Sequence, residues 1–133
     1  MPQRTDQLAY PIVNYEDATG AIEWLSRAFG AEEVAVYKDD DGKVEHMELS
    51  FEGGIVMGGS KGSGELAGKA EQGHPAWLYL VVSDPDAHHA RAVEAGAEVV
   101  IPLRDEEYGS RGYSALDPEG NVWSFGTYRP EVA

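Results

Sequence analysis

The sequence contains no cysteine and is poor in positive charge. Without thiols the chain has no disulfide scaffold, no cysteine-ligated zinc finger or iron–sulfur cluster, and no thiol nucleophile. It carries 10 Lys and Arg against 24 Asp and Glu, a formal net charge of −14. This acidic surplus repels phosphate backbones and anionic lipid, so nucleic acid and membrane surfaces are poor candidate partners.

Long hydrophobic runs are also missing. No segment approaches the ~18 apolar residues that span a bilayer, and the polar segment MPQRTDQ carries no secretory signal. We therefore expect a cytoplasmic protein. What is present is ordinary for a globular protein: 133 residues, 42% of them apolar and 26% charged, predict a single domain over residues 1–133.

Two segments of the chain repeat each other. Residues 17–30 read DATGAIEWLSRAFG, and residues 84–96 read DPDAHHARAVEAG. Each opens with Asp, which suits a helix N-cap, and closes with Gly, which suits the left-handed residue that ends a helix. We predict one helix in each segment. Their apolar residues at helical spacing are Ala18, Ile22, Leu25 and Phe29 in the first, and Ala87, Ala90 and Val93 in the second.

Similar strand-like text follows both helices. GAEEVAVY follows the first and GAEVVIPL the second, and Gly54 and Gly120 lie at the same distance beyond them. The chain therefore reads as two strand–helix–strand–strand–strand modules, residues 8–59 and 76–127, joined by a Gly-rich linker over residues 60–75. The predicted strands are 8–14, 31–38, 44–51 and 54–59 in the first module, and 76–82, 97–103, 111–116 and 121–127 in the second.

These repeats resemble the vicinal oxygen chelate superfamily, which includes glyoxalase I, ring-cleaving dioxygenases and bleomycin-resistance proteins. The resemblance rests on YEDATGAIEWLSRAFGAEEV, VSDPDAHHARAVEAGAEVV and DPEGNVWSF, and covers roughly residues 8–127. It implies an α+β fold in which two tandem βαβββ modules form a curved eight-stranded mixed sheet around a cavity, with helices on the convex face.

Metal-dependent members of that superfamily draw ligands from four strand positions, which fall in this chain at Tyr10, Gly58, Trp77 and Ser124. None of these is a histidine or a carboxylate, the donors that a divalent cation usually needs. We therefore expect no cofactor. The alternative is a displaced divalent metal held by His46 and Glu48, with His74 as a third ligand.

Strand alternation predicts which side chains line the cavity. His46 and Glu48 share one face of their strand, and Ser114 is the second-module counterpart of Glu48. The predicted ligand-binding residues are Tyr10, Ile12, Asn14, His46, Glu48, Trp77, Tyr79, Arg111, Ser114 and Ser124. The same reasoning also turns Val56, Gly58, Val81, Val122 and Gly126 toward the cavity.

Several of these residues have both a functional and a purely structural interpretation. His46 and Glu48 either hold a polar part of a ligand, act as an acid–base pair, or satisfy only each other. The aromatic residues Tyr10, Trp77 and Tyr79 form either ordinary core or a slot for a planar molecule.

The loop over residues 102–120 brings Arg104, Tyr108, Arg111 and Tyr113 near the cavity rim. Arg111 either grips a carboxylate or phosphate or pairs with Glu106 or Glu107. His88 and His89, adjacent in the second helix, are expected to face solvent.

The favoured hypothesis is a glyoxalase/bleomycin-resistance-like protein that binds a small aromatic or cationic organic molecule without a metal. A homodimer that shares its cavities is expected by analogy with the family. The alternative is an enzyme of the lyase, isomerase or dioxygenase type that uses the displaced metal or His46 and Glu48. A third interpretation is a purely structural or regulatory dimer with no ligand.

Overall fold

The computed structural model describes residues 4–62 and 75–132. The elements of the first module are β1 (Ile12–Tyr15), α1 (Ala18–Phe29), β2 (Glu32–Lys38), β3 (Val44–Phe51) and β4 (Gly54–Ser60). Those of the second module are β5 (Trp77–Val81), α2 (Pro85–Glu94), β6 (Glu98–Asp105), β7 (Arg111–Leu116) and β8 (Val122–Gly126). The two predicted βαβββ modules and the α+β class are confirmed.

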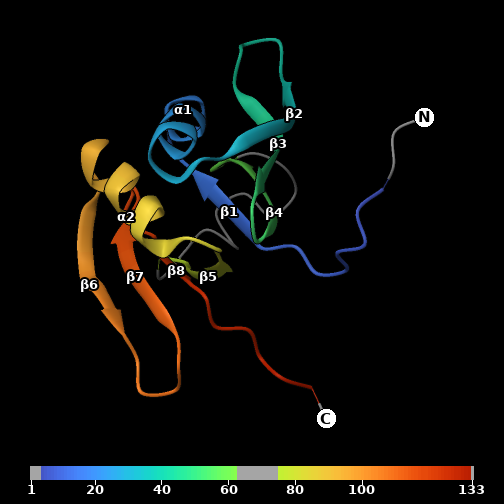
Figure 1. Cartoon of the computed structure of the whole chain (residues 1–133). Helices are drawn as coiled ribbons and strands as arrows, with labels where there is room; N and C mark the ends of the chain where they lie inside the picture. Colours follow the sequence, from blue (N-terminus) through green and yellow to red (C-terminus); the bar gives the residue numbers. More distant parts are fainter. Residues whose placement is uncertain (1–3, 63–74, 133) are drawn as a thin grey trace.

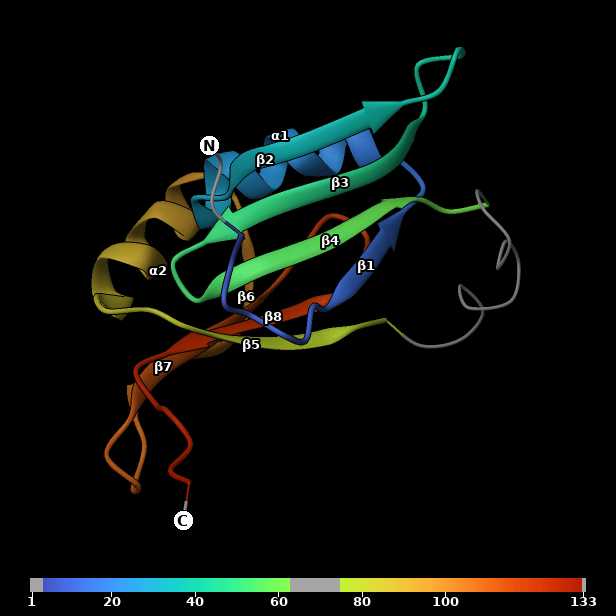
Figure 2. The same ribbon diagram turned by 90° about the vertical axis from the view of Figure 1, so that its right-hand side faces the viewer.

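The strands form two four-stranded sheets rather than one continuous ladder. Their orders are β1-β4-β3-β2 and β5-β8-β7-β6, so the two modules share one topology. In each sheet the first strand pairs in parallel with the last, and the other pairs are antiparallel. Figure 1 shows the two helices close together, and Figure 2 shows the strands of the first sheet fanning across the molecule with α1 behind them.

The predicted helix ends are confirmed. The Asp17 carboxylate accepts a hydrogen bond from the Gly20 backbone N–H at the start of α1, and Gly30 ends that helix with φ of 77°. The Asp84 carboxylate accepts one from the Ala87 N–H at the start of α2. These are the short-range preferences that predicted the helices, since a carboxylate satisfies free N–H groups and glycine tolerates positive φ.

The apolar face predicted for the second helix is wrong. Ala87, Ala90 and Val93 are exposed, while Pro85 and Ala92 are buried. The alanines carry too little apolar surface to decide which side of the helix is covered.

The core lies between the two modules. Phe29, at the end of α1, packs against two rings of β8, with centroid distances of 5.6 Å to Trp123 and 4.8 Å to Phe125. Phe51 of β3 meets Trp123 at 5.2 Å. Each sheet therefore uses its helix-covered face for the shared core, and no helix of the described residues packs on its other face, which we call the uncovered face.

Each module also holds the start of the other module's helix. The carboxylate of Glu119, in the β7–β8 turn, accepts hydrogen bonds from the backbone N–H groups of Glu16 and Asp17 just before α1. The carboxylate of Glu52, in the β3–β4 turn, accepts bonds from the N–H and hydroxyl of Ser83 just before α2. We call this pair of contacts the reciprocal clasp.

Strand boundaries differ from prediction most clearly in β1, which begins four residues later, in β6, which ends two residues later at Asp105, and in β4, which ends one residue later. β1 begins at Ile12, the first residue that pairs with β4. β4 extends through Ser60, so the predicted linker of residues 60–75 starts inside a strand. Residues 63–74 of that linker, with His74, lie outside the described residues.

The predicted facing of β4 is wrong by one residue. Val56 is buried in the core, and a Cβ on Gly58 would lie 2.0 Å from the Val13 carbonyl oxygen. Both therefore face the core, and Met57 occupies the position equivalent to Ser124. The cause is the turn before the strand, which is one residue longer in the second module than in the first.

No helix in the described part of the chain is long and apolar enough to cross a membrane.

Candidate functional site

A groove of about 420 Å³ lies on the uncovered face of the second sheet. Its volume falls within the ~300–1,000 Å³ typical of small-molecule pockets. Trp77 and Tyr79 alternate with core residues along β5, so both project onto this face, where they are 72% and 44% exposed. The other lining side chains come from β6, β7, β8 and the β6–β7 loop: Ile101, Arg104, Glu106, Tyr108, Ser110, Ser114 and Ser124. The prediction that Tyr113 lies at the cavity rim is wrong: its side chain, like that of Phe125, is buried on the opposite face of the sheet, beside His88.

Two serines lie beside Trp77 in the groove. The Trp77 indole Nε1–H donates to the Ser124 hydroxyl at 2.9 Å, and the hydroxyls of Ser114 and Ser124 lie 2.6 Å apart. These serines are directly opposite each other on β7 and β8, so their side chains share the groove face. The indole is thus held in place by a hydrogen bond while most of its ring stays exposed.

Tyr79 closes the neighbouring part of the groove. Its hydroxyl donates to the Tyr128 carbonyl at 2.9 Å, and burial raises its pKa above the usual value. Gly126 makes room for it, since a Cβ there would lie 2.9 Å from the Tyr79 hydroxyl oxygen. Tyr108 and Tyr128 meet edge to face at 5.3 Å. The groove therefore has an aromatic wall with fixed positions.

Arg104 and Glu106 form an ion pair at the groove, with 2.8 Å between the Arg104 Nε and a Glu106 carboxylate oxygen. Both side chains are partly exposed. Arg104 and Tyr108, both predicted near the cavity rim, line the groove. Glu106 was not predicted as the partner of Arg104, although residues two apart along a strand share one face.

The remaining predicted ligand-binding residues lie elsewhere. His46 Nε2 and a Glu48 carboxylate oxygen are 2.8 Å apart on β3, and both side chains are partly exposed. Tyr37 stacks near His46, with a centroid distance of 6.1 Å. This pair lies on the first sheet, which Ile12 and Asn14 join through β1 and β4. Tyr10 lies before β1, and its hydroxyl donates to the Gln7 carbonyl. None of these residues lines the groove within the chain.

Arg111 pairs with acidic side chains rather than with a ligand, but its partners are not the two predicted ones. Its guanidinium donates two hydrogen bonds to Asp86 at 2.9 and 3.0 Å and one to Asp105 at 3.3 Å. Glu106 and Glu107, the partners named from the sequence, are not the ones used. Arg111 therefore ties α2 to the β6–β7 hairpin and does not line the groove.

The superfamily's metal positions do not suit a divalent ion in this chain. With the corrected register they are Tyr10, Met57, Trp77 and Ser124, a set of phenol, thioether, indole and hydroxyl groups. Two of the four are already bonded to each other. The described residues also contain no group of three or more His, Asp or Glu side chains placed to hold a metal.

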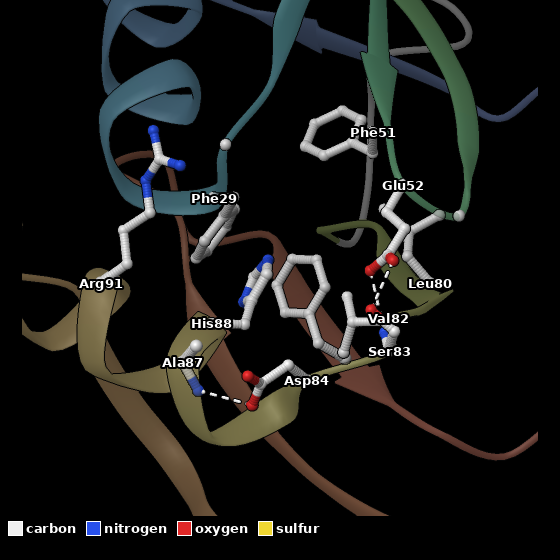
Figure 3. A pocket seen from close by; sticks show the side chains of 13 residues that line it. Phe29, Phe51, Glu52, Leu80, Val82, Ser83, Asp84, Ala87, His88 and Arg91 are labelled. Atoms are coloured by element: carbon white, nitrogen blue, oxygen red, sulfur yellow. Dashed lines mark hydrogen bonds between the residues drawn. The ribbon is translucent and has the colours of Figure 1, made fainter.

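A second cavity, of about 290 Å³, lies between the modules (Figure 3). Phenyl rings line its interior, and Glu52 reaches Ser83 across its mouth. The nearby Arg91 guanidinium donates to the carbonyls of Ser26 and Arg27 at the end of α1. The polar groups of this cavity therefore hold the modules together.

His88 lines the same cavity, which corrects the expectation that it faces solvent. Its Nδ1 lies within hydrogen-bond distance of the Tyr113 hydroxyl, and its ring packs 4.1 Å from Phe125. His89 also contacts Tyr113, edge to face at 5.0 Å. Burial lowers the pKa of His88 below its ordinary value, so the neutral ring is favoured.

Known proteins share both the sequence and the fold. Uncharacterized protein Mb0911c of Mycobacterium bovis is 36% identical over 127 residues, covering 92% of this chain and 84% of that protein. The crystal structure of TioX from Micromonospora sp. ML1 is similar with a TM-score of 0.78 and 31% identity, covering 96% of this chain and all of that one. A glyoxalase-related enzyme from Fulvimarina pelagi, 16% identical with a TM-score of 0.67, shares the fold over 93% of this chain and 89% of that one.

The family model described as Glyoxalase/Bleomycin resistance protein/Dioxygenase superfamily matches residues 6–125. That match covers both modules and the residues from which the resemblance was inferred. The chain belongs to this superfamily.

Proposed function

We propose that the protein binds a small, planar organic molecule in the groove of the second sheet, without a metal and without covalent chemistry. The observation that carries this proposal is the placement of Trp77. A large aromatic ring that lines the groove is fixed by its Ser124 hydrogen bond, yet the residue is 72% exposed. A planar ligand that covers this ring gains apolar burial without ordering a flexible side chain.

The expected gain is large enough to measure. A ligand that covers about 100 Å² of the indole gains roughly 2.5 kcal/mol at ~25 cal/mol per Å². Since about 1.4 kcal/mol is a factor of ten in affinity, loss of the ring should weaken binding at least tenfold. The net charge of −14 additionally raises the local concentration of cationic ligands.

We further propose a homodimer in which a second copy covers the uncovered sheet faces. Ile12 on the first sheet and Trp77 on the second are 62% and 72% exposed, which is unusual for large apolar side chains on sheet faces. A partner that places its first sheet over this groove would bring His46 and Glu48 to the ligand. Light scattering of the purified protein should give twice the mass of one chain, and Ile12→Asp should reduce it to one.

The test of binding is calorimetry with fused bicyclic aromatic compounds. Trp77→Ala should weaken binding at least tenfold, whereas Trp24→Phe, a change on α1 outside the groove, should leave it unaltered. Equal affinities of the wild type and Trp77→Ala would overturn the proposal.

A second candidate function is general acid–base catalysis by His46 and Glu48, favoured by the 2.8 Å between their polar atoms. Lactoylglutathione and extradiol substrate assays test it, after elemental analysis of the purified protein. Turnover that is lost in His46→Gln and Glu48→Gln would support this candidate over simple binding.

A further inference from the structure

We infer that the groove selects a planar aromatic ligand carrying a hydrogen-bond acceptor, such as the carbonyl of an aromatic amide or ketone, and disfavours an ammonium group. This inference rests on the proposed function and narrows its ligand class. The groove contains hydrogen-bond donors that have no acceptor within the described part of the protein, and it contains few free acceptors.

The first unused donor is a serine hydroxyl. Trp77, Ser114 and Ser124 together bring three polar hydrogens: one indole N–H and two O–H groups. They form only two hydrogen bonds with one another. The indole must donate to Ser124, so whichever serine donates to the other, one O–H remains without an acceptor within this cluster. Ser114 is buried and Ser124 is only half-buried, so the hydroxyl that a ligand can reach is that of Ser124, which is free to donate when Ser114 donates to it.

The second source of unused donors is Arg104. A guanidinium has five N–H groups, and the ion pair with Glu106 engages Nε. Among the described residues, no carboxylate or other acceptor is hydrogen-bonded to the terminal amino groups of Arg104. Arg104 lines the same groove as the serines. A ligand carbonyl can therefore accept from a serine hydroxyl or from the guanidinium.

The groove is much less suited to a cation. Among residues 4–62 and 75–132, Glu106 is the only carboxylate that lines the groove, and Arg104 already lies 2.8 Å from that carboxylate. An ammonium group that approached Glu106 would meet the positive charge of Arg104 at short range. The acidic surface attracts cations at a distance, but the groove itself presents hydrogen-bond donors, which bind an acceptor and not an ammonium group.

Three probes that share one ring system test the inference: 2-naphthamide, 2-naphthylmethylammonium and 2-methylnaphthalene. By calorimetry, the amide should bind the wild-type protein about tenfold more tightly than the other two, the equivalent of roughly one good hydrogen bond. Arg104→Gln and the double variant Ser114→Ala with Ser124→Ala should each reduce this preference at least threefold. Arg27→Gln, which removes the same charge from exposed α1, should not change it.

The results distinguish a failure of the proposed ligand preference from a failure of the proposed function. Equal binding of all three probes, or tighter binding of the ammonium, overturns this inference and leaves the proposed function standing. Failure of all three to bind at millimolar concentration overturns the proposed function and this inference with it. Because Ser124 also holds Trp77, the preference in each variant is taken as the ratio of its 2-naphthamide affinity to its 2-methylnaphthalene affinity. A ratio that stays at the wild-type value in both variants also overturns the inference.

Discussion

The carboxylate of Asp117 should be the most sensitive single group in the fold. It lies at the β7–β8 turn, 5% exposed, and accepts five hydrogen bonds. One oxygen accepts from the Tyr15 hydroxyl at 2.6 Å, the Asn121 amide at 2.9 Å and the Trp123 indole at 3.0 Å. The other accepts from the backbone N–H groups of Glu119 and Asn121.

The cost of Asp117→Ala follows from these donors. A buried donor that loses its acceptor costs about 1–3 kcal/mol, and three side-chain donors would lose theirs. Water entering the vacated space recovers part of this cost. We therefore expect the free energy of unfolding to fall by about 3–5 kcal/mol, a large part of the ~5–15 kcal/mol typical of a domain.

Urea denaturation followed by tryptophan fluorescence measures this loss. With a slope of about 2 kcal/mol per M, the midpoint should fall by roughly 2 M. Tyr15→Phe removes a single donor and should cost about 1–2 kcal/mol. Burial and the neighbouring Asp117 charge raise the pKa of Tyr15 far above its usual value, so the phenol remains a donor throughout.

Asp40→Ala provides the matched control, because it removes the same charge from an exposed turn and should change stability by less than about 0.5 kcal/mol. A loss below about 1 kcal/mol in Asp117→Ala would refute the claim that this carboxylate organises the turn.

Three further predictions follow from other contacts. Burial lowers the pKa of His88 in the folded protein, so its neutral ring stabilises the fold above about pH 6.5. The free energy of unfolding should fall as the pH drops from there through the lowered pKa. In His88→Phe, the thermal unfolding midpoint should depend less on pH over that window. Gly126→Ala should displace the Tyr79 ring, weakening binding of 2-naphthamide severalfold with less than about 2 kcal/mol lost in urea; unaltered binding would contradict the geometry. Glu119→Ala removes two bonds to backbone N–H groups and should cost about 1–2 kcal/mol in urea, whereas Glu131→Ala, an exposed change near the C-terminus, should cost nothing measurable.

Features set by neighbouring residues could be predicted from the sequence. Asp17 and Gly30 act within one helical turn, so the helix ends followed from local chemistry. Alternation along β5 correctly put Trp77 and Tyr79 on one face and Leu78 and Leu80 on the other.

Features set by contacts between segments could not be predicted. The equal spacing of Gly54 and Gly120 concealed a turn that is one residue longer in the second module, and a shift of one residue reverses every side chain of a strand. His88 looked like a solvent-facing polar residue, because its partners Tyr113 and Phe125 come from distant strands. Alternation also could not show that the modules meet through their helix-covered faces, which keeps His46 away from Trp77 within one chain.

The reciprocal clasp makes the two halves of the chain mutually dependent. Glu52 and Glu119 occupy equivalent positions of the repeat, and so do their targets Ser83 and Glu16, so the exchange obeys an approximate twofold symmetry. An isolated half would keep its own N-cap aspartate, but its glutamate and the donor groups just before its helix would both lose their partners. Two such halves would satisfy each other. In geometric terms the tandem chain is a symmetric pair whose members have been covalently joined, and neither half is expected to fold alone.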